Sequence, residues 1–492
     1  MHYILVLDEG TTSTRAMLFA PDGTCIDRAQ QALTQYYPLP GYVEHDAEQI
    51  WSLTLECARA VVQRAGGART ILALGITNQR ETVVFWDKRT GLPLAPAIVW
   101  QDRRTADAYD ALKAAGHEPV VQAKTGLLLD PYFSGAKIGW ALAHWPALRA
   151  AGRHLAVGTV DSYLAFRLTG GQHVTDATNA SRTALMALGS SGWDDGLLDL
   201  FGVPRRILPE ILDSAGSLGT TSAECFGAPI ALCGIAGDQQ AAAIGQGCLR
   251  AGLTKATFGT GAFILTQTGR SLPQSKHKLL STIAWQLGGE RHYALEGSVF
   301  TAGSLIRWMR DDLGLIQRPE ETDTLARSVP DNGGVYIVPA LSGLGAPHWR
   351  PDARGSIVGL HFAARKAHVA RAALEAMAHQ AHDLKLAFAA DGAEWTEVRI
   401  DGGMVANDWM AQDLADVLDV VVERPRFIET TALGAAMLAA VGAGVYSTLQ
   451  EAASMRGPVQ RFTPALDSGL RSTRLIGWQR AVDQTLSVSL NG

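Results

Sequence analysis

A short stretch near the start of the chain combines the residue types that phosphate chemistry needs. Residues 8–15 read DEGTTSTR and directly follow an uncharged run, YILVL, at residues 3–7. Gly10 lets the backbone approach an anion closely, hydroxyl and N–H groups can surround that anion, and the Asp8 carboxylate can hold a divalent cation. The same letters also fit an ordinary hairpin with a polar turn. These residues alone leave both interpretations open.

The flanking residues predict that this stretch is the turn of a hairpin. Residues 3–7 fit a strand buried on both faces, and apolar residues resume at Ala16, as in a return strand. Residues 25–36 fit a third antiparallel strand. Asp46 with Gln49 resembles a capping box, which predicts that a helix begins there.

Two further strands of the first half end in polar residues. Residues 71–76 are followed by TNQRE at 77–81, and residues 230–236 are followed by GDQQ at 237–240. A helix of small residues is expected after the second of these, at 241–247. Strands with helices between them predict an α/β first half with a mixed sheet.

The hairpin pattern returns about half a chain later. A strand at 254–258, a Gly-Thr-Gly turn and a return strand at 262–266 repeat the opening arrangement. A duplicated strand–turn–strand predicts two related domains that face one another. We expect the domains to be residues 1–247 and 248–492.

The rest of the second half predicts a buried strand at 334–339, a long helix at 369–388 and a strand at 398–401, followed by two glycines. An uncharged stretch at 430–450 is long enough to span a bilayer. Its Ala- and Gly-rich composition favours a tightly packed buried helix instead.

Composition excludes several classes of protein. At 492 residues, with 47% hydrophobic and 18% charged, the chain is an ordinary globular protein too long for one core. A formal net charge of −5 gives no reason to expect a nucleic-acid or membrane partner. Five scattered cysteines, never C-x-x-C, favour a reduced, cytoplasmic location without a thiol metal site. The first residues read as a strand, which argues against a signal peptide.

Nine short blocks, spread along nearly the whole chain, carry a family resemblance. They are residues 8–15, 40–46, 75–82, 99–105, 130–135, 234–240, 258–261, 343–347 and 401–403 with Asn407. These blocks resemble those of the FGGY carbohydrate kinases, and within that family those of the glycerol kinases. Any one block is weak, but nine in family order and spacing are specific, and residues 355–375 also fit the family's second signature. The resemblance implies the α/β, duplicated two-domain fold of the actin-like (ribonuclease H-like) ATPases, with nucleotide between the domains.

The resemblance implies a polyol site. A polyol offers only hydroxyl groups, so its site needs fixed donors and acceptors and an apolar wall for the carbon chain. Considered singly, an Arg–Glu pair could be a surface ion pair and an aromatic residue could belong to the core. The matching positions are Arg80, Glu81, Tyr132, Asp238 and Gln239 for the polar contacts, with Trp100 and Phe263 as walls.

Roles in phosphoryl transfer from ATP also follow from the resemblance. Asp238 would be the general base that takes the proton of the attacking hydroxyl, although an Asp there could simply cap the next helix. Asp8, acting through water, and Asp238 would be the carboxylates associated with Mg²⁺. The positions that match nucleotide-binding residues are Thr11, Thr12, Ser13, Arg15, Thr260, Gly303, Arg307, Gly403 and Asn407.

Three positions depart from the family's pattern. Glu9 stands where glycerol kinases usually have Gln, which would add negative charge beside the phosphates. Arg307 replaces a Gln near the nucleotide and puts that contact in doubt. Residues 221–229 lack the Gly-rich, Arg-containing loop that some members use for control by fructose 1,6-bisphosphate, and the histidine that others phosphorylate there.

The resemblance implies ATP-dependent phosphorylation of glycerol to sn-glycerol 3-phosphate. The expected partners are glycerol and MgATP, with no nucleic acid and no membrane span, and the chain is expected to form a homo-oligomer, a dimer or tetramer. One alternative is an FGGY kinase acting on another short polyol or ketose. A second is a non-catalytic, actin-like sugar sensor or assembly protein, against which the retention of Asp8 and Asp238 argues.

Overall fold

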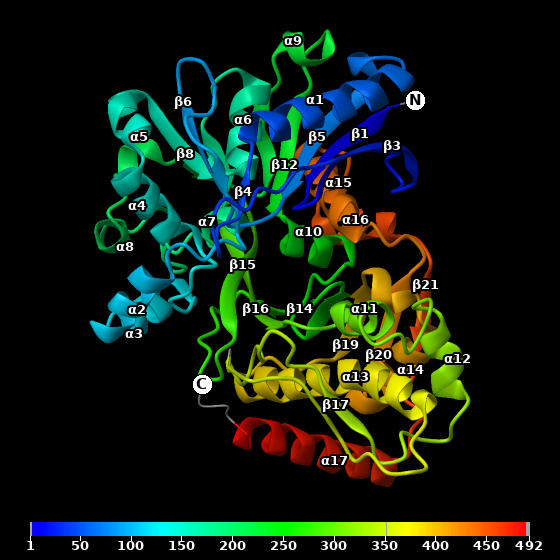
Figure 1. The fold of residues 1–492 in the computed structure, drawn as a ribbon. Coiled ribbons are helices and arrows are strands. Elements are labelled where there is room, and N and C mark those ends of the chain that lie inside the picture. Colours follow the sequence, from blue (N-terminus) through cyan, green and yellow to red (C-terminus); the bar gives the residue numbers. More distant parts are fainter. Residues whose placement is uncertain (1, 351, 489–492) are drawn as a thin grey trace.

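The computed structural model describes residues 2–350 and 352–488, and within them each half of the chain builds a large sheet (Figure 1). The first sheet has the strand order β11-β12-β5-β1-β2-β3. β1, β5 and β12 run parallel to one another, whereas β2, β3 and β11 pair antiparallel, so the predicted mixed sheet is confirmed. The strands are β1 (Tyr3–Glu9), β2 (Ser13–Phe19), β3 (Cys25–Ala32), β5 (Ile71–Asn78), β11 (Ala215–Thr220) and β12 (Ala231–Gly237).

Helix α1 (Ala47–Arg64) covers one face of this sheet, together with α6 (Val160–Thr169). The predicted cap is present, because the Asp46 side chain accepts hydrogen bonds from the backbone N–H groups of Glu48 and Gln49. In a capping box the Gln49 side chain would also accept a hydrogen bond from the backbone N–H of Asp46, and this part of the prediction is wrong. The Gln49 side chain instead accepts a hydrogen bond from the backbone N–H of Thr34 at 2.9 Å. This bond ties the helix to the chain beyond β3.

A smaller antiparallel sheet with the order β4-β7-β6-β8 lies beside the first, surrounded by short helices. Its aromatic and aliphatic side chains form a separate core. The strands are β4 (Glu44–His45), β6 (Val83–Asp87), β7 (Ala97–Ile98) and β8 (Leu155–Thr159), with the paired β9 (Val174–Asp176) and β10 (Glu210–Leu212) nearby. The helices are α2 (Ala106–Ala114), α3 (Glu118–Thr125), α4 (Ser134–His144), α5 (Pro146–Ala151), α7 (Ala177–Ala180), α8 (Asp195–Phe201) and α9 (Ala223–Phe226).

The second large sheet has the order β15-β16-β14-β13-β19-β20-β21. The long helix α13 and the helices α11, α12, α14 and α17 pack around it in the lower half of Figure 1. The strands are β13 (Leu253–Phe258), β14 (Ala262–Gly269), β15 (Leu280–Leu287), β16 (Glu290–Val299), β19 (Glu397–Asp401), β20 (Val421–Pro425) and β21 (Val459–Phe462), with β17 (Tyr336–Val338) paired to β18 (Ser356–Val358). The helices are α11 (Gly303–Asp311), α12 (Glu321–Arg327), α13 (Lys366–Ala390), α14 (Asp408–Leu418) and α17 (Ser468–Ser487).

Both predicted hairpins are present, and their surroundings match. β1 pairs with its return strand β2 on one side and with the parallel strand β5 on the other. β13 likewise pairs with β14 on one side and with the parallel strand β19 on the other. Helix α10 (Asp238–Gly245), which follows β12, lies between the two large sheets (Figure 1).

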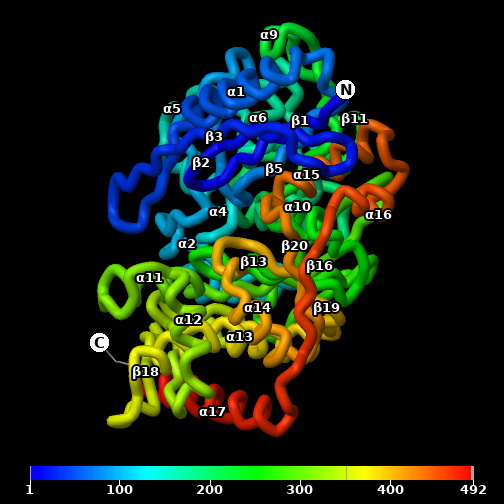
Figure 2. Tube along the Cα trace, turned by 90° about the vertical axis from the view of Figure 1, so that its right-hand side faces the viewer, coloured from blue at the N-terminus to red at the C-terminus, as the bar shows by residue number. Residues whose placement is uncertain are grey.

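The uncharged stretch near the end of the chain does form a buried helix, α15 (Thr430–Gly442). Although it belongs to the second half of the sequence, it packs against the first sheet and α10, as both views show (Figures 1 and 2). Its backbone lies so close to its neighbours that a Cβ on Gly434 would lie 1.8 Å from the carbonyl oxygen of Ala241, and one on Gly75 would lie 2.6 Å from that of Ala435. In the described residues no helix is both long and apolar enough to cross a membrane.

After α15 the chain passes through α16 (Leu449–Ala452) and returns along β21 to the second sheet, where α17 follows (Figure 2). The two halves are therefore joined by more than one crossing of the chain. The domain limits 1–247 and 248–492 remain a prediction. The limit falls between α10 and β13.

Candidate active site

The end of β1 holds an ion-paired carboxylate, Asp8. Arg15 Nη2 lies 2.5 Å from Asp8 Oδ2, and Arg15 Nη1 lies 2.6 Å from Oε2 of Glu429, which directly precedes α15. Burial raises the pKa of Asp8 to about 6; Arg15 opposes this, while the nearby Glu429 and Asp238 add to it. Arg15 thus contacts two carboxylates, while Asp238, which pairs with Arg80, is close enough to Asp8 to affect its pKa.

The side chain of Glu9 points away from the phosphate-type turn, and the prediction that it adds negative charge beside the phosphates is wrong. Successive side chains of a strand point to opposite faces, so Glu9 points away from the face of Asp8. It is fully buried against α1, where Thr54 Oγ1 donates a hydrogen bond to its Oε2 at 2.7 Å. Burial raises its pKa to about 8, so the carboxyl is uncharged at neutral pH.

The hydroxyl residues of the first turn have different neighbours. Trp100 Nε1 donates a hydrogen bond to Thr11 Oγ1 at 2.9 Å, which joins the predicted apolar wall to the turn. Thr12 is exposed, whereas Ser13 Oγ accepts a hydrogen bond from Gln30 Nε2 on β3. Thr11 and Thr12 therefore remain the better candidates for phosphate contacts.

The second turn packs tightly against the start of α11. The backbone N–H of Gly303 donates to the carbonyl oxygen of Gly259, and that of Ser304 to the carbonyl oxygen of Thr260. A Cβ on Gly303 would lie 2.6 Å from the Gly259 oxygen, so only glycine fits this approach. Gly303 and Thr260, predicted separately, thus belong to one structural unit.

Beside this unit lies a cavity of about 320 Å³, a suitable place for the adenosine part of a nucleotide. Gly403 lines it, and no atom lies within 4 Å of the Cβ position that Gly403 lacks. Asn407 lines it too, but its side chain caps α14 and donates to Thr322 Oγ1. The exposed Arg307 does not line this cavity. The walls of the cavity include Ile306, Pro319, Thr322, Gly403, Met404 and Asn407.

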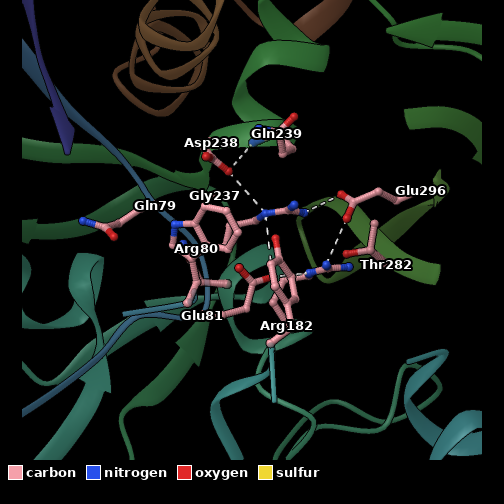
Figure 3. Close-up of polar contacts among 12 residues, drawn as sticks. Gln79, Arg80, Glu81, Arg182, Gly237, Asp238, Gln239, Thr282 and Glu296 are labelled. Carbon is pink, nitrogen blue, oxygen red and sulfur yellow. Dashed lines mark hydrogen bonds and ion pairs between the residues drawn. The ribbon is translucent and has the colours of Figure 1, made fainter. Parts of the chain in front are cut away.

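The predicted base begins a helix in the middle of the molecule. Asp238 is the first residue of α10, three residues earlier than the helix predicted from the sequence. Its Oδ1 accepts a hydrogen bond from the backbone N–H of Gln239 at 2.7 Å and lies 3.2 Å from Arg80 Nε (Figure 3). The side chain is 34% exposed, whereas that of Arg80 is 1% exposed. A substrate could therefore reach the carboxylate directly.

Four buried side chains form a closed arrangement of alternating charge next to Asp238 (Figure 3). Arg80 Nη1 lies 2.7 Å from Glu296 Oε2, Arg182 Nη2 lies 2.9 Å from Glu296 Oε1, and Arg182 Nε lies 2.7 Å from Glu81 Oε1. Arg80 Nε closes the circuit at 3.9 Å from Glu81 Oε1. We call this set the charge ring: Arg80, Glu81, Arg182 and Glu296.

Gln239 is held from the second sheet. Lys255 Nζ donates a hydrogen bond to Gln239 Oε1. Because an ammonium group has no acceptor, the amide must turn its oxygen to Lys255 and its Nε2 away from it. The register of β13, β14 and β16 places Phe263 and Glu296 on the same face of this sheet as Lys255, so three residues near the predicted substrate come from that face.

A buried lysine holds the backbone of Trp100, a predicted wall residue, and of Tyr132, a predicted polar contact. The rings of Trp100 and Tyr132 meet edge to face with their centroids 5.4 Å apart. Lys137 Nζ donates to the backbone oxygens of Trp100 and Tyr132, at 3.1 and 2.8 Å. Burial lowers the pKa of Lys137 to about 7.

Several of these residues were not predicted from the sequence: Arg182, Lys255, Glu296 and Glu429. Arg182 is the one charged residue in 177–193, Lys255 the one in 251–269, and Glu296 the one in 293–302. A lone charge in a stretch expected to be buried must find a partner, and this was the available signal.

The fold defines a class of protein: a two-domain protein of the actin-like ATPase type, with one hairpin turn of the predicted kind in each half. Two family models match the chain, the FGGY family of carbohydrate kinases, N-terminal domain, over residues 3–245, and the C-terminal domain of the same family over residues 254–443. The chain belongs to the FGGY family of carbohydrate kinases, and the predicted family and fold are confirmed.

Individual relatives narrow the comparison. The chain is 53% identical over 488 residues to a glycerol kinase of Methylobacterium nodulans, with 97% of each chain covered. It is 52% identical to a glycerol kinase of Rhodospirillum centenum, with 98% of each covered. Among solved structures, the Plasmodium falciparum glycerol kinase with ADP matches with a TM-score of 0.94 and 34% identity, over 99% of this chain and 98% of that one.

Proposed function

We propose that this protein transfers the γ-phosphoryl group of ATP to a terminal hydroxyl of glycerol, which yields sn-glycerol 3-phosphate and ADP. The observation that carries the proposal is the position of Asp238. Its side chain is part-exposed, contacts Arg80 and Gln239, and lies close enough to Asp8 to raise the pKa of Asp8. Relatives that are named glycerol kinase and match over almost the full length support glycerol as the substrate.

The proposed roles follow from the donors and acceptors available. The Asp238 carboxylate accepts the proton of the attacking hydroxyl as the new O–P bond forms. Gln239 Nε2, turned away from Lys255, donates to a substrate oxygen. Arg80 and Glu81, which we call the hydroxyl-binding pair, supply one donor and one acceptor group to the remaining hydroxyls. Trp100 and Phe263 form the apolar wall, and Tyr132 supplies a further polar contact.

The nucleotide and its metal fit the residues present. The cavity beside Gly403 suits the adenosine part, and the turns that contain Thr11, Thr12 and Thr260 offer hydroxyl and N–H groups to the phosphates. No group of three or more His, Cys, Asp or Glu residues in the described ranges could hold a metal by itself. Asp8 and Asp238 would therefore hold Mg²⁺ together with water and the phosphates. When bound, Mg²⁺ neutralises phosphate charge.

The best-supported alternative substrate is another short polyol or ketose. Arg307 remains a departure from the family's pattern, but it does not line the cavity proposed for the adenosine part of the nucleotide. Glu9 no longer favours this alternative, since it is buried away from the phosphate-type turn and uncharged at neutral pH.

We expect a cytoplasmic homo-oligomer, and light scattering coupled to gel filtration measures its size.

A substrate screen tests the proposal. ADP release would be followed with MgATP and, separately, glycerol, dihydroxyacetone, erythritol and the pentitols. We expect the highest kcat/KM with glycerol, and enzymatic assay of sn-glycerol 3-phosphate identifies the product. Turnover confined to a pentitol or a ketose would overturn glycerol as the substrate, and the Asp238→Asn variant serves as the control for contaminating kinases.

A further inference from the structure

The charge ring contains two residues that the proposed reaction does not use directly. Arg182 follows α7 in the first half of the chain, and Glu296 lies on β16 in the second. Their side chains are 0% and 2% exposed, comparable with the 1% of Arg80 and of Glu81, so burial does not separate the two pairs; of the four, the proposed reaction assigns a substrate contact to Arg80 and Glu81 alone. Arg182 and Glu296 nevertheless both contact the hydroxyl-binding pair at hydrogen-bond distance.

We propose that Glu296 and Arg182 are positioning residues, which fix the hydroxyl-binding pair in the geometry that receives the substrate. The inference rests on the proposed function, and it goes beyond it by assigning residues of both halves to the construction of the polyol site. Three features of the ring support it.

The first feature is the division of labour among the donors of Arg80. Its Nη1 is used by Glu296 and lies 3.3 Å from Gln240 Oε1. Its Nε and Nη2 are buried and have no hydrogen-bond partner among the described residues, although Nε lies 3.2 Å from Asp238 Oδ1 as an ion pair. A guanidinium held by one edge, with a free donor elsewhere, is suited to bind a hydroxyl oxygen.

The second feature is charge balance. The ring has two guanidinium groups and two carboxylates. Burial alone would raise the pKa of Glu296, but Arg182 and Arg80 lower this pKa to about 2. Glu296 is thus ionised at any working pH. Without its charge, the nearest remaining carboxylate to Arg80 is that of Asp238, 3.2 Å from Nε, compared with 3.9 Å for Glu81.

The third feature is the backbone of Glu81. Its φ is 63°, a left-handed conformation that non-glycine residues rarely adopt and that the surroundings must maintain. Arg182 Nε holds its Oε1 at 2.7 Å, and Ser134 Oγ donates to its backbone oxygen at 2.9 Å. Loss of Arg182 would release the carboxylate end of this residue.

The competing explanation is that the ring only stabilises the fold. Buried ion pairs often add little net stability, but removing one partner is costly in either case, so a loss of stability alone cannot decide. The kinetic constants can. A positioning role predicts a change in the KM for glycerol, whereas a purely structural role predicts a lower melting temperature with unchanged constants in the folded fraction.

The test compares Glu296→Gln with a matched control, Glu375→Gln. Glu375 is also 2% exposed and also lies between two arginines, Arg371 at 2.9 Å and Arg474 at 3.6 Å, but on α13, away from the charge ring. We expect Glu296→Gln to raise the KM for glycerol by about tenfold or more and to lower kcat, because Arg80 moves toward Asp238, with the KM for MgATP within about twofold. The control should change none of these constants.

Two further variants complete the test. Arg182→Met should also raise the KM for glycerol. In the double variant with Glu296→Gln and Arg182→Met the ring is again neutral, so the rise in KM should be smaller than the product of the two single rises. If Glu296→Gln does not fold, Glu296→Asp keeps the charge but withdraws it by one methylene, and the same rise in KM is expected. An unchanged KM for glycerol in the folded variants would overturn the inference.

The wild-type protein separates the two levels of the argument. If it shows no glycerol-dependent ADP release, the proposed function fails, and the ring is then tested with whichever polyol of the screen is turned over. If wild type is active and Glu296→Gln behaves like Glu375→Gln, the proposed function stands and the positioning role fails.

Discussion

Arg80 Nε lies 3.2 Å from Oδ1 of Asp238, and the same guanidinium is held through Nη1 by Glu296 at 2.7 Å. The proposed base is therefore oriented by a cation that is itself anchored in the opposite half of the protein. A backbone N–H, that of Gln239, fixes the same carboxylate oxygen from the other side. Oδ2 carries neither contact and is the atom that we expect to face the attacking hydroxyl.

Replacing this carboxylate by an amide tests its role as base. Asp238→Asn should keep the fold and much of the glycerol binding but lose about 10²–10⁴-fold in kcat, because Asn can hydrogen-bond a hydroxyl but cannot take its proton. Steady-state kinetics and glycerol binding by calorimetry measure the two effects. Asp213→Asn is the control, since Asp213 accepts hydrogen bonds from Gln286 and Gly289 outside the site. A near-normal kcat would remove Asp238 from the role.

The contact between Lys255 and Gln239 leads to a second prediction. Lys255→Met frees the Gln239 amide to rotate, so we expect the KM for glycerol to rise by about three- to tenfold. Lys385→Met serves as the control, because Lys385 lies on α13 and donates to the backbone oxygen of Leu418 at the end of α14. Equal glycerol constants for the two variants would mean that Lys255 does not set the orientation of the amide.

Much of this arrangement could be predicted from the sequence because it depends on local patterns. The apolar run before Asp8 and the Gly-Thr-Gly turn at 259–261 predict two hairpins, and both are present. The small residues from Thr430 onward predict a close-packed helix. What local patterns cannot supply is the partner of that helix, which lies in the first sheet, in the other half of the chain.

The charge ring was missed for the same reason. Its members lie at 80–81, 182 and 296, and only the folded chain brings them together. Glu9 shows a different kind of error. The prediction gives it the same environment as its neighbour Asp8, whereas adjacent residues of a strand face opposite sides.

The corrected environment of Glu9 has a consequence for stability against pH. Burial raises the pKa of Glu9 from the ordinary 4.5 to about 8, so between these values the folded protein holds a proton that the unfolded chain has lost. The free energy of unfolding therefore falls as pH rises through this window, at about 1.4 kcal/mol per pH unit at most for one group. Glu9→Gln removes this dependence.

We expect Glu9→Gln to melt close to wild type at pH 5 and at a higher temperature than wild type at pH 8.5. Differential scanning calorimetry across the range measures the difference, in which the contributions of all other groups, Asp8 included, cancel to a first approximation. Activity at neutral pH should be retained, because the carboxyl is uncharged there and Thr54 can donate equally to an amide oxygen. A pH-independent difference between the two proteins would show that Glu9 is ionised when folded.

The last prediction concerns regulation at residues 221–229. A doubly phosphorylated sugar needs basic side chains and free backbone N–H groups, and here both are scarce. Ser222 Oγ accepts the N–H of Glu224 at the start of α9, and Arg59 donates through Nε and Nη2 to the carbonyl oxygens of Cys225 and Glu224. The exposed Glu224 carboxylate would repel the phosphates. We expect millimolar fructose 1,6-bisphosphate to leave the rate of ADP release unchanged at constant free Mg²⁺; a saturable inhibition would show that another basic surface binds it.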